Sequence, residues 1–144
     1  MSKWVRDIDE HRSMQTNLAA ALDTSERTIL VVDDDTAIRD ALSDVLKMLG
    51  YQVVVASDGK RALELLRSGI DPFVVLLDLA MPGMDGYQFC EEVLTDGRLS
   101  GLQVIVITAA PSHRAKSLGV AEILTKPVPL ERLLNVLESV ERGV

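Results

Sequence analysis

The sequence predicts an α/β fold, a doubly wound parallel sheet of five strands flanked by five helices. From Thr28 onward, short apolar segments alternate with segments whose apolar residues recur at helical spacing. The predicted strands are apolar instead of alternating with polar residues, which is typical of parallel strands covered on both faces. Glycine and capping residues separate these segments at the expected helix ends.

Short runs of apolar, mostly branched residues predict the strands. The first run ends abruptly in acidic residues, and the third is apolar throughout. Sequence periodicity alone permits several orders of these strands in the sheet. The five segments are, in chain order, Ile29–Val32, Tyr51–Ala56, Phe73–Leu77, Leu102–Ile107 and Glu122–Thr125.

Local signals mark where the helices between these strands begin and end. Gly50 and Gly69 are the expected C-terminal glycines of the first two helices. Ser57 or Asp58 is the expected N-cap of the second helix. The fourth helix is short, and the last one is amphipathic. The expected helices are Thr36–Gly50, a helix from Ser57 or Asp58 to Ser68, about Tyr87–Thr95, Ser112–Leu118 and Leu130–Arg142. A turn is expected at Met81–Gly86, before the third helix.

The chain divides into an N-terminal extension, residues 1–27, and a domain, residues 28–144. Spaced apolar residues in the extension could line one face of a helix, but Arg12 and Gln15 interrupt the stripe. We expect it to be partly helical or a flexible, solvated tail. Because the final helix ends close to Val144, we expect a stand-alone domain.

Composition excludes several classes of function. The 144 residues carry a net charge of −7 and no run of Lys or Arg, which argues against a nucleic-acid-binding surface. The single cysteine, Cys90, excludes an internal disulfide and fits a reducing compartment. The apolar stretch Leu18–Leu22 is too short to be a signal or a membrane span. We therefore expect a cytoplasmic protein that binds neither nucleic acid nor membrane.

Polar and charged residues gather where the predicted strands end. In open α/β sheets, ligands bind beyond the carboxyl ends of the strands, so these residues are the candidate site. Each signal alone is weak, since an acidic residue after a strand is commonly a helix cap, as expected of Asp35 or Thr36. The occurrence of all these residues together at the strand ends would be rare by chance, so the combination points to a functional site. It comprises Asp33, Asp34 and Asp35 after the first strand, Asp78 after the third, Thr108 after the fourth, and Lys126 and Pro127 after the fifth.

This set of residues suits phosphoryl transfer to a carboxylate. Clustered carboxylates repel one another, and a hard divalent cation, Mg²⁺ or Mn²⁺, relieves that repulsion. Asp78 can act as the nucleophile and form an acyl phosphate. Lys126 and the Thr108 hydroxyl can each bind a phosphoryl oxygen. Two other phosphate-binding motifs are excluded. The motif of haloacid-dehalogenase-type phosphatases, read from Asp33, has Ala37 where Thr or Val is required, and no nucleotide-binding P-loop occurs.

The chain resembles the receiver domains of response regulators along about Thr28–Arg142. The resemblance implies the flavodoxin-like strand order 2-1-3-4-5. It implies a signalling domain of a two-component or phosphorelay pathway, which catalyses only its own phosphorylation and dephosphorylation. The expected partners are a histidine kinase or histidine phosphotransfer protein and a downstream protein, with the chain a monomer or weak dimer. The segments that carry the resemblance are Ile29–Asp35, Leu76–Gly86, Val106–Ala109 and Leu124–Pro127.

The resemblance also implies a role for each matching position. Asp78 corresponds to the phosphoacceptor, and Thr108 and Lys126 to the signalling hydroxyl and the phosphate-binding lysine. The small residue Ala109 leaves room for the threonine to move, and the bond before Pro127 is expected to be cis. The implied metal ligands are Asp33, Asp34, Asp78 and the backbone carbonyl of Ala80.

Two departures from the family pattern lie on the face that usually signals. Ile123 stands where the family often has Tyr or Phe, so a hydroxyl-bearing rotamer switch is absent there. Thr108 and Lys126 are 126 − 108 = 18 positions apart, about one helical turn (~3.6 residues) fewer than is common in the family. The alternative function is a receiver-like docking scaffold that is rarely phosphorylated. The intact acidic pair, Asp78, Thr108 and Lys126 count against it, because degenerate receivers usually lose one of these residues.

Overall fold

The computed structural model describes residues 27–79, 85–109 and 111–141. Its five strands form one parallel sheet in the order β2-β1-β3-β4-β5, which confirms the predicted fold class and strand order. The strands are β1 (Thr28–Val32), β2 (Gln52–Ala56), β3 (Val74–Leu77), β4 (Val104–Thr108) and β5 (Glu122–Thr125). The helices are α2 (Thr36–Met48), α3 (Gly59–Arg67), α4 (Gly86–Thr95), α5 (His113–Lys116) and α6 (Leu130–Glu141).

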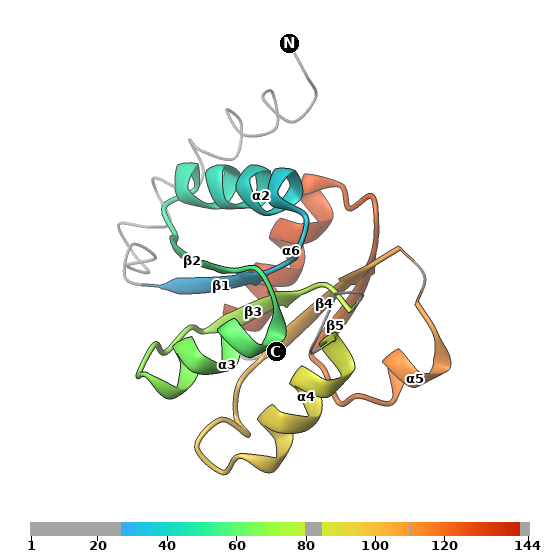
Figure 1. Ribbon diagram of the computed structural model, residues 1–144. Helices are drawn as coiled ribbons and strands as arrows, with labels where there is room; N and C mark the ends of the chain where they lie inside the picture. The colour runs from blue at the N-terminus through green and yellow to red at the C-terminus, as the bar shows by residue number, and fades with distance from the viewer. Residues whose placement is uncertain (1–26, 80–84, 110, 142–144) are drawn as a thin grey trace.

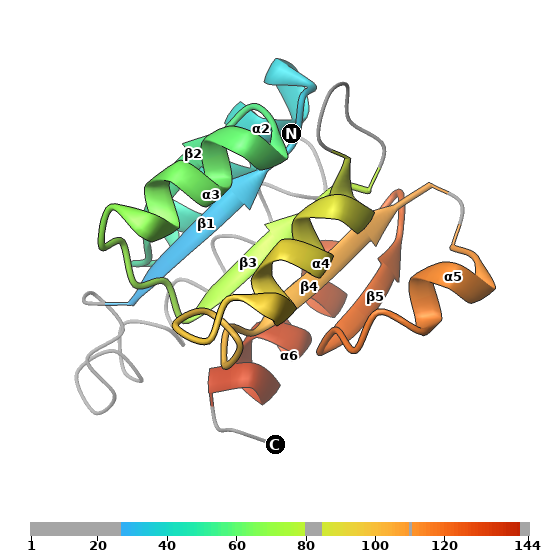
Figure 2. The same cartoon turned by 60° about the horizontal axis from the view of Figure 1, so that its bottom comes forward.

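Helices cover both faces of the sheet, with α2 and α6 on one side and α3, α4 and α5 on the other (Figures 1 and 2). Successive residues of a strand enter opposite cores. In β1, Ile29 and Val31 pack against α2 and α6, whereas Leu30 and Val32 pack against α3 and α4. This two-sided burial explains why the strand sequences are apolar throughout.

Two helices end as their glycines predict. Gly50 has φ 99°, its N–H donates to the Lys47 carbonyl (3.0 Å), and the Tyr51 N–H donates to the Leu46 carbonyl (3.1 Å). This pair of bonds is a Schellman motif, and the left-handed residue within it favours glycine. Gly69 ends α3 in the same way, with φ 112°. Because Tyr51 takes part in closing α2, β2 begins one residue later than predicted.

Side chains of acidic and hydroxyl residues cap the helix starts. Asp35, not Thr36, caps α2 by accepting from the Ile38 N–H, and Asp58, not Ser57, caps α3. Asp85 caps α4 and Ser112 caps α5. These caps fix where each helix leaves the carboxyl edge of the sheet.

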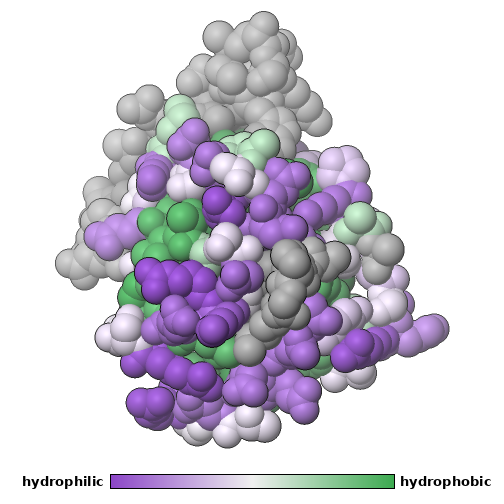
Figure 3. All heavy atoms as spheres, viewed as in Figure 1, coloured by the Kyte–Doolittle hydropathy of each residue, from purple (hydrophilic) through white to green (hydrophobic). Residues whose placement is uncertain are grey.

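Polar side chains cover most of the face shown in Figure 3, and hydrophobic surface is confined to smaller areas between them. Within the described ranges, no helix has both the length and the apolar character needed to cross a membrane. The predicted extension, residues 1–27, lies outside the described residues except for Arg27. Arg27 forms an ion pair with Glu141 at the end of α6 (3.2 Å).

Candidate functional site

Parallel pairing brings the predicted site residues to one edge of the sheet. Val32 and Leu77 are partners in neighbouring strands, so Asp33 and Asp78 leave the sheet side by side. The Asp78 N–H donates to the Val32 carbonyl at 3.0 Å, which extends the ladder by one residue and fixes the backbone of Asp78. The Lys126 N–H donates to the Thr108 carbonyl at 2.9 Å, which extends the β4–β5 ladder by one residue and fixes the backbone of Lys126.

Three carboxylates meet at this edge. Asp33, Asp34 and Asp78 each place one oxygen within 4.8 Å of the others. Asp33 and Asp78 are buried, with exposed fractions of 3% and 9%, while Asp34 is exposed. An all-oxygen donor set, open to solvent on the Asp34 side, has the chemistry that a hard divalent cation requires.

Backbone and side-chain donors hold Asp33 in place. One of its carboxylate oxygens accepts from the Asp35 N–H at 2.9 Å. The backbone carbonyl of Asp33 accepts from the Arg39 guanidinium at 2.9 Å, which ties the end of β1 to the first turns of α2. The second carboxylate oxygen of Asp33 is left facing Lys126.

Lys126 pairs with the two buried carboxylates. Its Nζ lies 3.4 Å from Asp33 Oδ2 and 3.7 Å from Asp78 Oδ2. The side chain is 23% exposed, so the ammonium group sits at the solvent-accessible rim of the site. The Lys126–Pro127 peptide bond is cis, the configuration that the resemblance implies.

The predicted switch residues line β4 and β5. Thr108 ends β4 and is 6% exposed, and the next residue, Ala109, is exposed. Ile123 is partly buried and packs against the core on the α3 and α4 side of the sheet. Ala80, the predicted carbonyl ligand, lies outside the described residues, as do positions 81–84 of the predicted turn.

Gly86 is a site residue that the sequence reasoning missed. A Cβ on Gly86 would lie 2.6 Å from the Leu79 Cα and 2.9 Å from the Asp78 carbonyl oxygen. The Gly86 N–H also donates to the Leu79 carbonyl at 3.0 Å. The start of α4 therefore packs directly on the backbone of Asp78 and Leu79. A glycine at the first helical position, directly after the Asp85 cap, is the sequence signal that could have revealed this contact.

An apolar groove lies beside the acidic cluster. It has a volume of about 370 Å³ and runs from the first half of α2 to the loop before α6. Its lining includes Ile38, Leu42, Lys126, Pro127 and Leu130. Lys126 belongs to both the groove and the acidic site.

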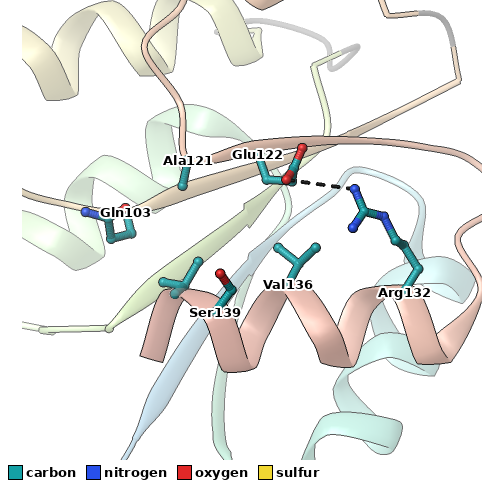
Figure 4. Close-up of a pocket in the computed structure, with 7 residues that line it drawn as sticks. Gln103, Ala121, Glu122, Arg132, Val136 and Ser139 are labelled. Atoms are coloured by element: carbon teal, nitrogen blue, oxygen red, sulfur yellow. Dashed lines mark ion pairs between the residues drawn. The ribbon is translucent and has the colours of Figure 1, made fainter. Parts of the chain in front are cut away.

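A second hollow, of about 420 Å³, lies between β5 and α6 and is drawn in Figure 4. Glu122 and Arg132 form an ion pair across it at 3.8 Å. Glu122 begins β5 and Ser139 is near the end of α6, so this hollow faces the end of the sheet opposite to Asp78. It is therefore separate from the acidic site.

Comparisons with known proteins agree with this geometry. Residues 29–138 match the family model described as response regulator receiver domain. Response regulator MprA of Mycolicibacterium vanbaalenii is 40% identical over 118 residues, which cover 79% of this chain and 50% of that protein. Sensor histidine kinase CheAY of Helicobacter pylori is 30% identical over 146 residues, covering 91% of this chain and 18% of that protein.

Solved structures show the same fold. Chemotaxis protein CheY4 of Vibrio cholerae superposes with a TM-score of 0.73 at 30% identity, covering 80% of this chain and 98% of that one. Response regulator protein TrrA of Thermotoga maritima, solved in complex with Mg(2+)-BeF, superposes with a TM-score of 0.71 at 28% identity, covering 79% of this chain and 98% of that one. The chain spans about half the length of the first curated relatives, 47% and 50%.

Proposed function

Since the chain belongs to the receiver domain family of two-component response regulators, we propose that it accepts a phosphoryl group on Asp78. The observation that carries this proposal is the placement of the Asp78 carboxylate. It is 9% exposed at the end of a central strand, within 4.8 Å of two more carboxylates and 3.7 Å from the Lys126 ammonium. We propose that the phosphorylated and unphosphorylated forms differ in their contacts with a downstream protein.

The transfer needs a nucleophile and charge stabilisation more than acid–base chemistry. A carboxylate oxygen of Asp78 attacks the phosphorus of a phosphohistidine on the donor protein. A P–O bond forms as the P–N bond breaks, and the imidazole leaves with the electron pair and takes up a proton. Lys126 then pairs with one phosphoryl oxygen, and the Thr108 hydroxyl donates a hydrogen bond to another. In this reaction the domain catalyses only its own phosphorylation and, with water as acceptor, its own dephosphorylation.

Asp33, Asp34 and Asp78 fit a divalent cation, Mg²⁺ or Mn²⁺, because their oxygens already converge within 4.8 Å. We propose the Ala80 carbonyl as a further ligand. When bound, the cation neutralises the carboxylates and the phosphoryl oxygens. Asp33 is oriented for this role by the Asp35 N–H, and the Lys126 ammonium balances part of the remaining negative charge.

The donor must bring a phosphohistidine to the open side of the site. The groove beside Lys126 is almost wholly apolar, so it fits an apolar helix face of a histidine kinase or histidine phosphotransfer protein. Ile38 and Leu42 on α2 and Pro127 before α6 would form the contact. We propose that this exchange takes place in the cytoplasm, whose reducing conditions suit the free thiol of Cys90.

The test is labelling with a small phosphodonor such as acetyl phosphate in the presence of Mg²⁺, read by intact-mass spectrometry. The wild-type chain should gain one phosphoryl group, and Asp78→Asn should gain none. Asp71→Asn is the matched control, because Asp71 is exposed and lies before β3, at the other end of the same strand.

Undiminished labelling of Asp78→Asn would contradict the assignment. A wild-type chain that is labelled by neither small donors nor phosphohistidine proteins, yet binds a partner, would favour the docking scaffold.

A further inference from the structure

Tyr87 connects the start of α4 to the one-turn helix α5. Its hydroxyl lies 3.1 Å from the Ser112 Oγ, within hydrogen-bond distance. The Arg114 guanidinium carbon lies 3.9 Å from the centre of the Tyr87 ring, a cation–π contact. We refer to Tyr87, Ser112 and Arg114 together as the Tyr87 clamp.

The clamp contacts a very short element. Helix α5 has four residues, His113–Lys116, of which only Ala115 is buried. A single helical turn is not stable in isolation, so its position depends on tertiary contacts. Ser112 serves twice, because its Oγ also accepts from the Ala115 N–H at 3.2 Å as the cap of α5. Movement of Ser112 would therefore disturb both the clamp and the helix cap.

The clamp lies between the two strand ends that would bind a phosphoryl group. On one side, Tyr87 follows Gly86, which packs on the Asp78 and Leu79 backbone. On the other side, three residues, 109–111, separate Ser112 from Thr108. Because this connection is short, we expect a shift of Thr108 toward a group on Asp78 to change the position of Ser112 relative to Tyr87.

Resting on the proposed function, we propose that the Tyr87 clamp is the switch that couples Asp78 to α5. The clamp closes in the unphosphorylated arrangement, and phosphorylation of Asp78 opens it. Ile123 has no hydroxyl and packs partly buried against the α3 and α4 core, so it offers no equivalent hydrogen bond. The surface that α5 and Arg114 form would then differ between the two states.

Removing the Tyr87 clamp should change the affinity for a phosphoryl analogue in a direction that linkage fixes. A contact that exists only in the unphosphorylated arrangement opposes activation, so its removal must favour the activated state. Tyr87→Phe keeps the ring and removes only the hydroxyl. Loss of one neutral hydrogen bond should therefore raise the affinity for beryllofluoride with Mg²⁺, a phosphoryl analogue, by about fivefold. A purely structural role for Tyr87 would not raise this affinity.

The experiment combines beryllofluoride titration by calorimetry with amide hydrogen exchange of residues 111–120. In the wild-type chain, beryllofluoride should speed exchange in this segment. Tyr87→Phe should exchange faster there before any addition and bind beryllofluoride more tightly. Arg114→Gln, which removes the cation–π contact, should shift both readouts in the same direction.

Tyr51→Phe is the matched control, because the Tyr51 hydroxyl is buried and has no hydrogen-bond partner among the described residues. It should leave exchange and affinity at the wild-type values. Unchanged or weaker beryllofluoride binding by Tyr87→Phe, with normal binding by the wild type, would overturn the clamp and leave the proposed function standing. A wild-type chain that binds no beryllofluoride would overturn both.

Discussion

Replacing Gly86 by alanine should destabilise the fold and slow the labelling of Asp78, because a Cβ has no room there. The new atom would lie 2.6 Å from the Leu79 Cα, 2.8 Å from the Leu79 Cδ2 and 2.9 Å from the Asp78 carbonyl oxygen. Alanine gains up to about 1 kcal/mol in a helix relative to glycine. Overpacking against backbone, which cannot rotate away, costs about 3 kcal/mol. The net loss is therefore about 2 kcal/mol.

Urea denaturation followed by circular dichroism measures this change. With a typical slope for a small domain, the midpoint should fall by about 1 M. Gly97→Ala is the matched control, since a Cβ on Gly97 meets nothing within 4 Å. Its stability should stay the same or rise by less than about 1 kcal/mol. Equal midpoints for the two variants would refute the reasoning, because they would mean that α4 moves freely away from Asp78.

Three further predictions concern the metal, the lysine and the cysteine. Asp34→Asn should weaken Mg²⁺ binding at least tenfold, since unit charges near a protein surface interact by about 4 kcal/mol at 4 Å. An unchanged Mg²⁺-induced shift in the melting temperature would contradict this. Lys126→Ala should still permit some labelling, but without the exchange response in residues 111–120, and Lys126→Arg should restore that response only in part. Full restoration would contradict the point-charge role. Burial raises the pKa of the Cys90 thiol from 9.0 to about 11, so it stays protonated at pH 8 and iodoacetamide should react slowly until urea is added. Because the unfolded thiol ionises first, the stability that burial of the neutral thiol contributes should be lost between about pH 9 and pH 11. Rapid native-state alkylation would show that the thiol is accessible.

The order and type of the elements could be predicted because they depend on local pattern. The apolar runs and the glycine stops at Gly50 and Gly69 are visible along the chain, and so are the acids at the strand ends. The strand order followed from the resemblance, not from periodicity. The choice between Ser57 and Asp58 as the α3 cap was left open, because both side chains can cap a helix.

Contacts between distant elements could not be predicted in this way. The lack of room for a Cβ on Gly86, which would lie 2.9 Å from the Asp78 carbonyl oxygen, depends on how α4 packs on the sheet. The Tyr87 clamp joins Tyr87 to Ser112, 25 positions away, through a hydroxyl and to Arg114 through the ring face, and neither contact leaves a periodic signal. The short Thr108 to Lys126 spacing did indicate a short helix, although α5 is shorter than the predicted Ser112–Leu118.

The ion pair between Asp33 and Lys126 joins positions 93 apart in the chain. It can form only after β1, β3, β4 and β5 have paired in parallel, and parallel pairing over long separations is slow because the loop entropy is lost first. We therefore expect the acidic site to be complete only when the whole sheet is assembled. The pair could serve as a probe of folding: the rate at which Lys126 reaches Asp33 reports when the whole sheet is assembled.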